Sequence, residues 1–235
     1  MLVTFDHSQE VGENIQTFFF KPDRPVHFTA GQFAEWKIEH PKADKRRDKR
    51  WFTISSSPTD ELVSLTTKRA EANGSSFKDA LFRLQPGSQI HMSDPMGDFV
   101  LPKLIQTPLI FVAGGIGITP FHSMLTWLTA TKETRPIKLL YGVRSEDEII
   151  FQDTFDKANI HPTIVVSEPT PAWGGERGRI SAEMILGLMQ PSDDSLVYVS
   201  GPEAMVETIE KDLKKAGINK NQLVLDFFPN YEATY

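Results

Sequence analysis

A short run of residues combines three chemical groups that a nucleotide cofactor needs. It reads Arg50-Trp51-Phe52-Thr53-Ile54-Ser55-Ser56. In a β-strand the side chains alternate between two faces, so Arg50, Phe52 and Ile54 would share one face and the residues between them the other. An arginine can hold phosphate, an aromatic ring can stack on a heterocycle, and hydroxyls can hydrogen-bond to the heterocycle's edge. The run therefore favours a flavin nucleotide as its ligand.

A glycine-rich turn lies farther along the chain. After the nearly unbroken apolar run 108–113 come Gly114-Gly115-Ile116-Gly117-Ile118-Thr119-Pro120. Such a turn between a buried strand and a helix offers backbone amides to a pyrophosphate. A dinucleotide fingerprint has a third glycine where Pro120 stands, and proline suits a first helical turn because no amide hydrogen is needed there. We expect a nucleotide-binding turn whose helix packs on its strand differently from the usual dinucleotide fold.

A second loop of the same kind follows a later strand-like run, 196–199. It reads Ser200-Gly201-Pro202-Glu203-Ala204-Met205. In a parallel sheet, loops of this kind open at the carboxyl ends of the strands, where ligands bind. A plain turn is the alternative interpretation of Gly201-Pro202. Two such loops in one sheet favour a shared cleft.

Composition excludes several classes of protein. The chain of 235 residues has a net charge of −6, which disfavours attraction to nucleic acid. No stretch approaches the ~20 apolar residues that cross a bilayer, and no basic-then-apolar leader is present. We expect a cytoplasmic protein without membrane insertion. The chain has no cysteine, which excludes disulfides, a thiol nucleophile and a cysteine-ligated iron–sulfur cluster. Electrons that leave this protein would therefore pass to a separate carrier.

Histidines and a basic cluster complete the candidate residues. The six histidines lack the spacing of metal ligands, and we expect surface or loop residues at 7, 27, 40, 91, 122 and 161. We predict no metal site. The basic cluster is either a solvated loop tip or a patch that faces phosphate or a partner, and Arg50 stands apart as the first residue of the flavin-like run. Its members are Lys42, Lys45, Arg46, Arg47, Lys49 and Arg50.

The elements that position these residues change type along the chain. Strand-like runs occur first at 15–20, 33–38, 51–55, 61–67 and 89–92, with one helix after Gly74-Ser75-Ser76. This pattern favours an antiparallel β-barrel of Greek-key type, and the serine-capped helix would present amides to an anion. After residue 108, strands alternate with helices expected at about 148–158, 181–189 and 203–216, which indicates a parallel α/β domain. We predict domains at 1–103 and 104–235.

Taken together, these motifs resemble the ferredoxin–NADP reductase family of flavoproteins. The resemblance covers essentially the whole chain, in the family's order. It rests on 50–55 for the flavin motif, 74–76 for the flavin-pyrophosphate helix, 95–102 for the end of the barrel, and the loops 113–120 and 200–205. It implies an FAD-binding barrel followed by a pyridine-nucleotide domain.

The resemblance also implies roles for residues near the flavin. Arg50 would pair with the flavin pyrophosphate, Phe52 would pack on the isoalloxazine, and Thr53 would direct its hydroxyl at flavin N5. Amides of Ser75 and Ser76 would hold phosphate. The predicted FAD-binding set is Arg50, Trp51, Phe52, Thr53, Ile54, Ser55, Thr67, Gly74, Ser75, Ser76 and Phe77.

A second set would bind the dinucleotide donor. It comprises Gly114, Gly115, Gly117, Thr119, Pro120, Ser200, Gly201, Pro202 and Met205. Arg144 and Ser145 could hold a 2′-phosphate, as could Arg177 and Arg179 in a Gly-rich loop. Glu146 or Asp147 could instead accept from a 2′-hydroxyl, which would favour NADH. We favour NADPH.

Three positions depart from the family pattern or stay open. Phe52 replaces a tyrosine, so stacking survives without a phenol hydrogen bond. Ser200 replaces a cysteine, and we expect a slower hydride step because serine is less polarizable. Phe228 could cover the flavin face that nicotinamide must reach; Tyr231 or Tyr235 could do so instead, or simply belong to a frayed tail. The candidate catalytic residues are Thr53, Ser200 and Phe228.

The sequence thus predicts an enzyme, an FAD-dependent NAD(P)H reductase. It would take hydride onto flavin and pass electrons to a separate acceptor, either ferredoxin, flavodoxin or an oxygenase component. One alternative is a flavin-binding electron-transfer subunit that does not turn over freely. The other is a free flavin reductase, from which FAD would leave on dilution.

Overall fold

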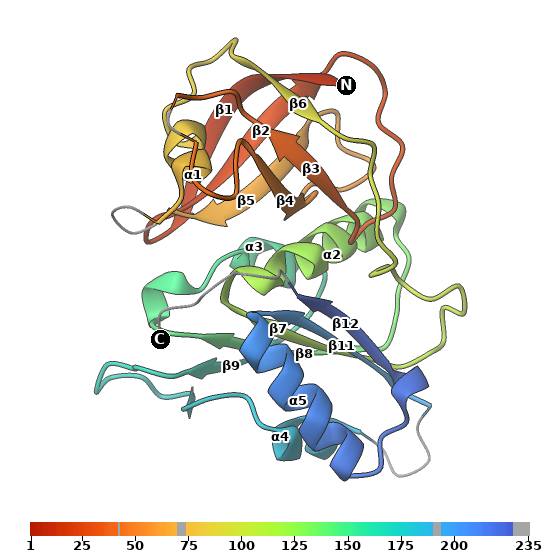
Figure 1. Cartoon of the computed structure of the whole chain (residues 1–235). Coiled ribbons are helices and arrows are strands. Elements are labelled where there is room, and N and C mark those ends of the chain that lie inside the picture. The colour runs from red at the N-terminus through yellow and green to blue at the C-terminus, as the bar shows by residue number, and fades with distance from the viewer. Residues whose placement is uncertain (42, 70–73, 190–193, 228–235) are drawn as a thin grey trace.

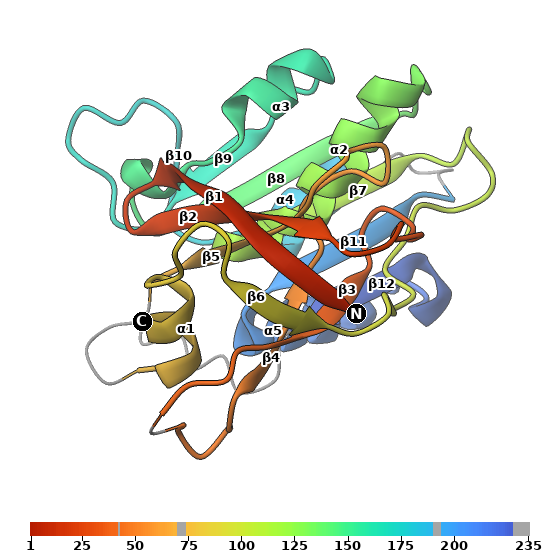
Figure 2. The same ribbon diagram turned by 90° about the horizontal axis from the view of Figure 1, so that it is seen from above.

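Two six-stranded sheets build the molecule, one above the other (Figure 1). The computed structural model describes residues 1–41, 43–69, 74–189 and 194–227. Figure 2, seen from above, shows the first sheet lying over the second. The first sheet is antiparallel and the second is parallel, as the sequence predicts. The last strand of the first sheet ends at Met92 and the first strand of the second begins at Leu109.

The antiparallel sheet has the strand order β4-β3-β6-β1-β2-β5. Its outermost strands meet where the Ser55 amide donates to the Ser64 carbonyl (2.8 Å), which closes the sheet into a barrel. Strands β2 and β3 are separated by β1 and β6, a crossover of the kind that Greek-key barrels use. The strands are β1 (Leu2–Gly12), β2 (Ile15–Pro22), β3 (Phe33–Lys37), β4 (Lys49–Thr53), β5 (Val63–Lys68) and β6 (Gln89–Met92), with α1 (Ser76–Leu81) beside them.

Large side chains fill the barrel, among them Phe18, Phe20, Trp36 and Leu65, all at most 1% exposed. They come from positions that alternate along their strands, which is why the short strands could be recognised. Strand β1 is the exception, because the sequence analysis did not identify it. Its residues 6–10 are exposed on both faces, so they show no alternation, and pairing with β2 holds them extended.

The parallel sheet has the order β10-β9-β8-β7-β11-β12. Helices α2 and α3 pack on the face toward the barrel, and α4 and α5 cover the other face (Figure 1). The strands are β7 (Leu109–Gly114), β8 (Ile137–Val143), β9 (Thr163–Val166), β10 (Glu176–Arg177), β11 (Leu196–Gly201) and β12 (Leu223–Phe227). The helices are α2 (Thr119–Thr131), α3 (Gln152–Lys157), α4 (Ala182–Leu188) and α5 (Glu203–Lys215), with short 3-10 turns η1 (Gly115–Ile118), η2 (Glu146–Glu148) and η3 (Lys220–Gln222).

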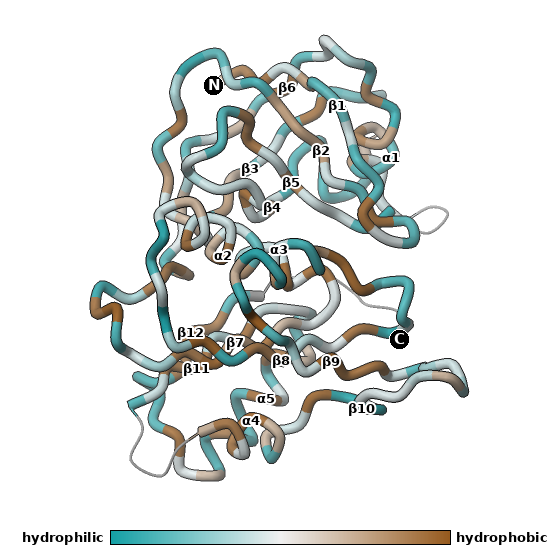
Figure 3. The backbone as a smooth tube through the Cα atoms, turned by 180° about the vertical axis from the view of Figure 1, so that it is seen from behind, coloured by the Kyte–Doolittle hydropathy of each residue, from teal (hydrophilic) through white to brown (hydrophobic). Residues whose placement is uncertain are grey.

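The strand order explains where the two glycine loops lie. Strand β7 is central and buried along its whole length, and Figure 3 shows the hydrophobic strands β7, β8 and β11 together in the middle of this layer. The chain runs outward from β7 to β8, β9 and β10, then returns to place β11 on the other side of β7. Loops on the two sides of such a reversal diverge and leave a crevice at the carboxyl ends of the strands.

Two expectations need correction near α3. The predicted helix 148–158 is instead the turn η2 followed by the short α3, because Ile149 is extended and Phe151 takes a positive φ of 64°. His122, expected on the surface or in a loop, lies on α2. Its ring stacks on Phe151 with centroids 3.7 Å apart, and its Nδ1 lies 2.9 Å from the Thr154 hydroxyl. Burial lowers the pKa of His122 to about 4, so it is neutral at pH 7.

Specific hydrogen bonds join the barrel to the parallel sheet. The Ser123 hydroxyl on α2 donates to the Ser56 carbonyl (2.6 Å), and both residues are buried. Tyr198 on β11 donates to the Val100 carbonyl (2.8 Å), and the Glu13 amide donates to the Asp147 carbonyl (3.0 Å). Each of these bonds fixes one layer against the other.

Over the part of the chain that the structure describes, none of the helices is long and apolar enough to span a bilayer.

The Ser123–Ser56 bond generates the first prediction. Changing Ser123 to Ala leaves the buried Ser56 carbonyl without its side-chain donor, and we expect a loss of about 1–2 kcal/mol in unfolding free energy. Urea unfolding followed by circular dichroism measures the change. Ser8→Ala, an exposed serine on β1, is the matched control and should change stability by less than about 0.5 kcal/mol. An equal effect of the two substitutions would contradict this role of Ser123.

Candidate functional site

Strand β4 carries the first four residues of the flavin-like run, and 54–56 follow the strand. The predicted alternation holds from Arg50 to Phe52, whereas Ile54 and Ser55 both lie in the barrel interior. Phe52 is buried, and its ring lies 5.7 Å from that of Phe77 on α1. The Arg50 guanidinium carbon lies 5.6 Å from the centre of the same Phe77 ring, so Arg50 and Phe52 share one side of the strand. Trp51 on the other side is half exposed and packs against Phe33, with ring centroids 5.3 Å apart.

The hydroxyls of this run have different surroundings. Thr53 is 4% exposed, and no residue that the structure describes hydrogen-bonds to its hydroxyl. Ser55 is completely buried, and its hydroxyl lies 2.9 Å from that of Ser64 and 3.0 Å from that of Thr66 inside the barrel. Thr53 is thus free to meet a ligand, whereas Ser55 supports the strand from within.

Other predicted flavin contacts are also deeply placed. Ile54 and Phe77 are 0% exposed and belong to the barrel core, so they shape the site from beneath. Thr67 on β5 is 1% exposed, and its hydroxyl donates to the Lys68 carbonyl at 3.4 Å. The exposed Gly74 accepts from the Arg46 guanidinium (3.1 Å) through its carbonyl.

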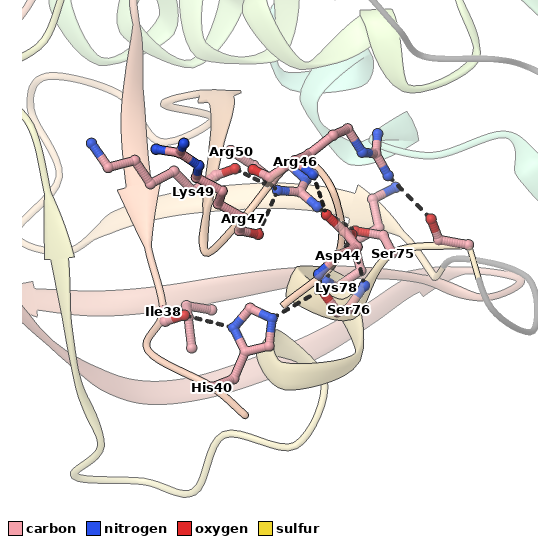
Figure 4. A network of polar contacts seen from close by, with 11 residues as sticks. Ile38, His40, Asp44, Arg46, Arg47, Lys49, Arg50, Ser75, Ser76 and Lys78 are labelled. Carbon is pink, nitrogen blue, oxygen red and sulfur yellow. Dashed lines mark hydrogen bonds and ion pairs between the residues drawn. The ribbon is translucent and has the colours of Figure 1, made fainter. Parts of the chain in front are cut away.

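Arg50 is the centre of a polar network (Figure 4). Its guanidinium is 12% exposed and forms a 2.6 Å ion pair with the Asp44 carboxylate. Its Nη1 donates to the carbonyls of Arg46 (3.0 Å) and Lys49 (2.6 Å), among others, and Nη2 lies 3.5 Å from the Ser75 hydroxyl. Burial lowers the pKa of Arg50, while the Asp44 carboxylate opposes that effect. The buried Nε has no partner among the described residues.

The two serines at the start of α1 complete this network. Ser75 caps the helix, because its hydroxyl accepts from the Lys78 amide (3.4 Å). The Ser76 amide donates to Asp44 (3.1 Å), and the Ser76 hydroxyl accepts from the Asp44 amide and lies 2.9 Å from His40 Nε2. The sequence analysis assigned no role to Asp44. Only the fold reveals that it joins Arg50 to Ser76.

The two glycine loops touch each other through their backbones. A Cβ on Gly117 would lie 2.3 Å from the Ser200 carbonyl oxygen, and one on Gly114 would lie 2.3 Å from the Met205 sulfur. A Cβ on Gly201 would lie 3.2 Å from the Gly114 backbone. Gly115 differs, because it has a φ of +51° and faces open space. Packing against the Ser200 backbone thus requires glycine at position 117, while Gly115 leaves room for a ligand phosphate.

Thr119 and Pro120 begin α2, with proline in its first turn as predicted. Thr119 is 3% exposed, and its hydroxyl donates to the Ile116 carbonyl (3.1 Å), which closes the turn η1. Pro202 precedes α5 as its N-terminal cap. Both loops are therefore strand–turn–helix units, the structure that the sequence pattern indicates.

Ser200 has an acidic partner that sequence reasoning did not assign. Its hydroxyl donates to Asp226 Oδ2 (3.3 Å), because β12 runs parallel to β11 with Asp226 opposite Ser200. Burial raises the pKa of Asp226 to about 6, and the Ser200 hydrogen bond lowers it by less. A pairing of this kind is not visible in a sequence, because it depends on which strand lies beside β11. Phe228, Tyr231 and Tyr235 lie outside the described residues.

The residues proposed to choose the donor lie after β8 and on or directly after β10. Arg144 forms an ion pair with Glu168 (3.0 Å), and Ser145 caps η2. Glu146 accepts from the amide (2.9 Å) and hydroxyl (2.7 Å) of Thr170. The exposed Arg177 donates to carbonyls of the same loop, including that of Trp173, and Arg179 is exposed nearby.

These observations fit two cofactors. A buried guanidinium beside serine hydroxyls, under a strand with an uncommitted hydroxyl, suits a flavin nucleotide. A glycine turn that faces open space at a strand-order reversal suits a dinucleotide. Among the residues that the structure describes, no group of three or more acidic or histidine side chains could hold a metal ion.

Comparisons with known proteins agree with this geometry. Residues 111–211 match the family model of the oxidoreductase NAD-binding domain. Ferredoxin–NADP reductase B of Sorangium cellulosum is 29% identical over 195 residues, which is 78% of this chain and 78% of that protein. The flavohemoprotein of Oceanobacillus iheyensis is 25% identical over 228 residues, 92% of this chain and 56% of that protein. The chain thus spans little more than half the length of that relative.

A solved structure shows the same fold over nearly the whole chain. The FAD/NAD-binding domain of nitric oxide dioxygenase from Vibrio cholerae superposes with a TM-score of 0.83 at 18% identity. The match covers 97% of this chain and 98% of that domain. The barrel and the parallel sheet therefore have the fold of that FAD/NAD-binding domain, and residues 111–211 match the oxidoreductase NAD-binding domain.

Proposed function

We propose that this chain is an FAD-dependent NAD(P)H reductase that passes electrons to a separate acceptor. One observation carries the proposal: the end of the flavin-like run is hydrogen-bonded to the helix that follows the glycine turn, through Ser56 and Ser123 (2.6 Å). This bond would hold the two proposed cofactor sites, which are built on different sheets, next to each other. Hydride transfer requires such proximity between donor and acceptor.

The chain's own residues would bind and orient the cofactors. FAD and NAD(P)H supply the redox chemistry when bound. Arg50 provides the buried cation for flavin phosphate, and the Thr53 hydroxyl is free to hydrogen-bond at the flavin ring. Gly115 admits the donor's phosphates, and the contact of Gly117 with Ser200 keeps both loops of the donor site together.

Ser200 and Asp226 would form the polar end of the donor site. Both lie at the carboxyl ends of neighbouring strands, and Ser200 is 0% exposed. With a pKa of about 6, Asp226 is mostly ionised at pH 7 and holds the Ser200 hydroxyl proton toward itself.

The choice of donor rests on the contacts of Glu146, and the choice of acceptor on the names of the relatives. We favour NADPH, because the Glu146 carboxylate already accepts two hydrogen bonds from Thr170 and is less able to take a ribose hydroxyl. The relatives' names include a ferredoxin–NADP reductase, an NADH oxidoreductase and the reductase subunit of glycine betaine monooxygenase, which support a separate protein acceptor. We place the flavin domain at 1–103, the donor domain at 104–235 and the protein in the cytoplasm.

The proposed activity is tested by anaerobic titration of the FAD-loaded protein. We expect NADPH to bleach the flavin absorbance near 450 nm, with NADH less effective at matched concentrations (about threefold or more in rate). Absence of bleaching by both donors would support the alternative of a flavin-binding subunit without free turnover. Loss of FAD on dilution would support a free flavin reductase.

Replacing Ser200 by Cys tests the donor-side loop. A thiol is more polarizable than a hydroxyl, and we expect flavin reduction to accelerate at least about threefold, on the order of 0.6 kcal/mol in activation free energy. Stopped-flow absorbance measures the rate. Ser195→Cys, a buried serine before β11, serves as the control and should leave the rate unchanged. No gain from cysteine at position 200 would count against a role for this side chain in the hydride step.

The raised pKa of Asp226 predicts a pH-dependent stability. The folded-state pKa of about 6 exceeds the unfolded value of about 3.9, so folding binds a proton between these values and stability falls as pH rises through them. Asp226→Asn cannot ionise. We expect the free energy of unfolding of this variant, relative to that of wild type, to rise by on the order of 2 kcal/mol between pH 4.5 and pH 7.5. Urea unfolding at both pH values measures this difference, and a constant difference would refute the assignment.

A further inference from the structure

Asp44 holds the cation that the proposed function assigns to flavin phosphate. Its Oδ2 lies 2.6 Å from Arg50 Nη2 and accepts from the Ser76 amide at 3.1 Å (Figure 4). Its Oδ1 accepts from the Arg46 amide at 2.8 Å. A carboxylate that bridges a guanidinium and a backbone amide uses the same donors that a phosphate oxygen uses. The chain therefore supplies its own anion at this place.

The remaining contacts of Arg50 strengthen this conclusion. Nη1 donates to the carbonyls of Arg46, Arg47 and Lys49, and the buried Nε has no partner among the described residues. The guanidinium is thus turned toward the loop that carries Asp44. A phosphate that approached Arg50 would meet the Asp44 carboxylate, and two anions on one cation repel each other.

The charge of Asp44 is secure at neutral pH. Burial raises the pKa of its carboxyl group, but hydrogen bonds from the Arg46 amide and the Arg50 guanidinium outweigh burial, so the pKa lies below its usual value. Protonation therefore does not release Arg50 under ordinary conditions. An approaching anion must displace Asp44, or Asp44 must already have moved away.

We propose that Asp44 is an intramolecular competitor of the flavin pyrophosphate for Arg50. The inference rests on the proposed function, in which Arg50 anchors FAD. While Asp44 occupies Arg50, the chain is not competent to bind phosphate, and the apparent affinity for FAD falls in proportion to the fraction of molecules with Arg50 released. FAD is then held loosely enough to exchange, and displacement of Asp44 accompanies its binding.

The opposite role for Asp44 makes the opposite prediction. If Asp44 only oriented Arg50 for the ligand, its removal would weaken FAD binding, because a disordered guanidinium costs more entropy to fix. Competition predicts tighter binding after removal. The sign of the change in affinity thus separates the two roles.

The experiment measures FAD binding to the apoprotein by quenching of flavin fluorescence. We expect Asp44→Asn to bind FAD about tenfold more tightly than wild type, and Asp44→Ala to shift the same way. Asp48→Asn is the matched control: it removes the same charge from the same loop, its side chain has the same 28% exposure, and it faces Lys37 instead of Arg50. Its affinity should stay within about twofold of wild type.

Two further measurements test whether the tighter FAD binding depends on Arg50 and on the phosphate groups. In an Arg50→Ala background, Asp44→Asn should no longer tighten FAD binding, because the contested cation is gone. Riboflavin lacks phosphate, so its affinity should not respond to Asp44→Asn. Tightening that persists without Arg50, or that appears equally with riboflavin, would overturn the competition.

The outcomes also separate this inference from the proposed function. Wild type that binds FAD and bleaches with NADPH, together with unchanged or weaker binding by Asp44→Asn, refutes the competition and leaves the reductase intact. Failure of wild type and both Asp44 variants to bind FAD refutes the flavin site itself and the competition with it. Tighter FAD binding confined to Asp44→Asn and Asp44→Ala supports both.

Discussion

The hydrogen bond from Ser123 to the Ser56 carbonyl joins the two halves of the candidate site. Ser56 ends the flavin-like run of the barrel, and Ser123 lies one turn into the helix that follows the glycine turn. Both groups are buried, so water cannot replace either partner. This constraint relates the barrel strand to the donor loops, and the chemistry of two cofactors depends on that relation.

Within the parallel sheet, close backbone contact holds the two glycine loops together. Gly117 lets the loop after β7 touch the end of β11, because a Cβ at this position would lie 2.3 Å from the Ser200 carbonyl oxygen. The reversal of strand order at β7 brings these loops from distant parts of the sequence to one edge. Ser200 is buried at this contact, where β12 adds Asp226 beside it. The proposed donor site thus draws on three separate segments.

Each half of the site holds a carboxylate in a different electrostatic setting. Asp44 faces the Arg50 guanidinium and amides, which stabilise its charge and lower its pKa. Burial destabilises the charge of Asp226 and raises its pKa to about 6, and the neutral Ser200 hydroxyl offsets this effect only in part. The Asp44 carboxyl is therefore ionised at neutral pH, whereas the Asp226 carboxyl titrates near neutral pH.

The sequence by itself determined the order of motifs, the two classes of sheet and most of the candidate site. Local patterns sufficed there: alternation in β2 to β4, the buried run of β7, and turns made of glycine and proline. It missed β1, whose residues 6–10 are exposed on both faces. It also placed His122 on the surface or in a loop, and it predicted one helix over 148–158 where the structure has a turn and the short α3. Only the tertiary structure decided that Asp44 pairs with Arg50, Asp226 with Ser200 and Ser123 with Ser56. Those contacts depend on which strands and loops become neighbours, and local residue patterns carry no information about distant neighbours.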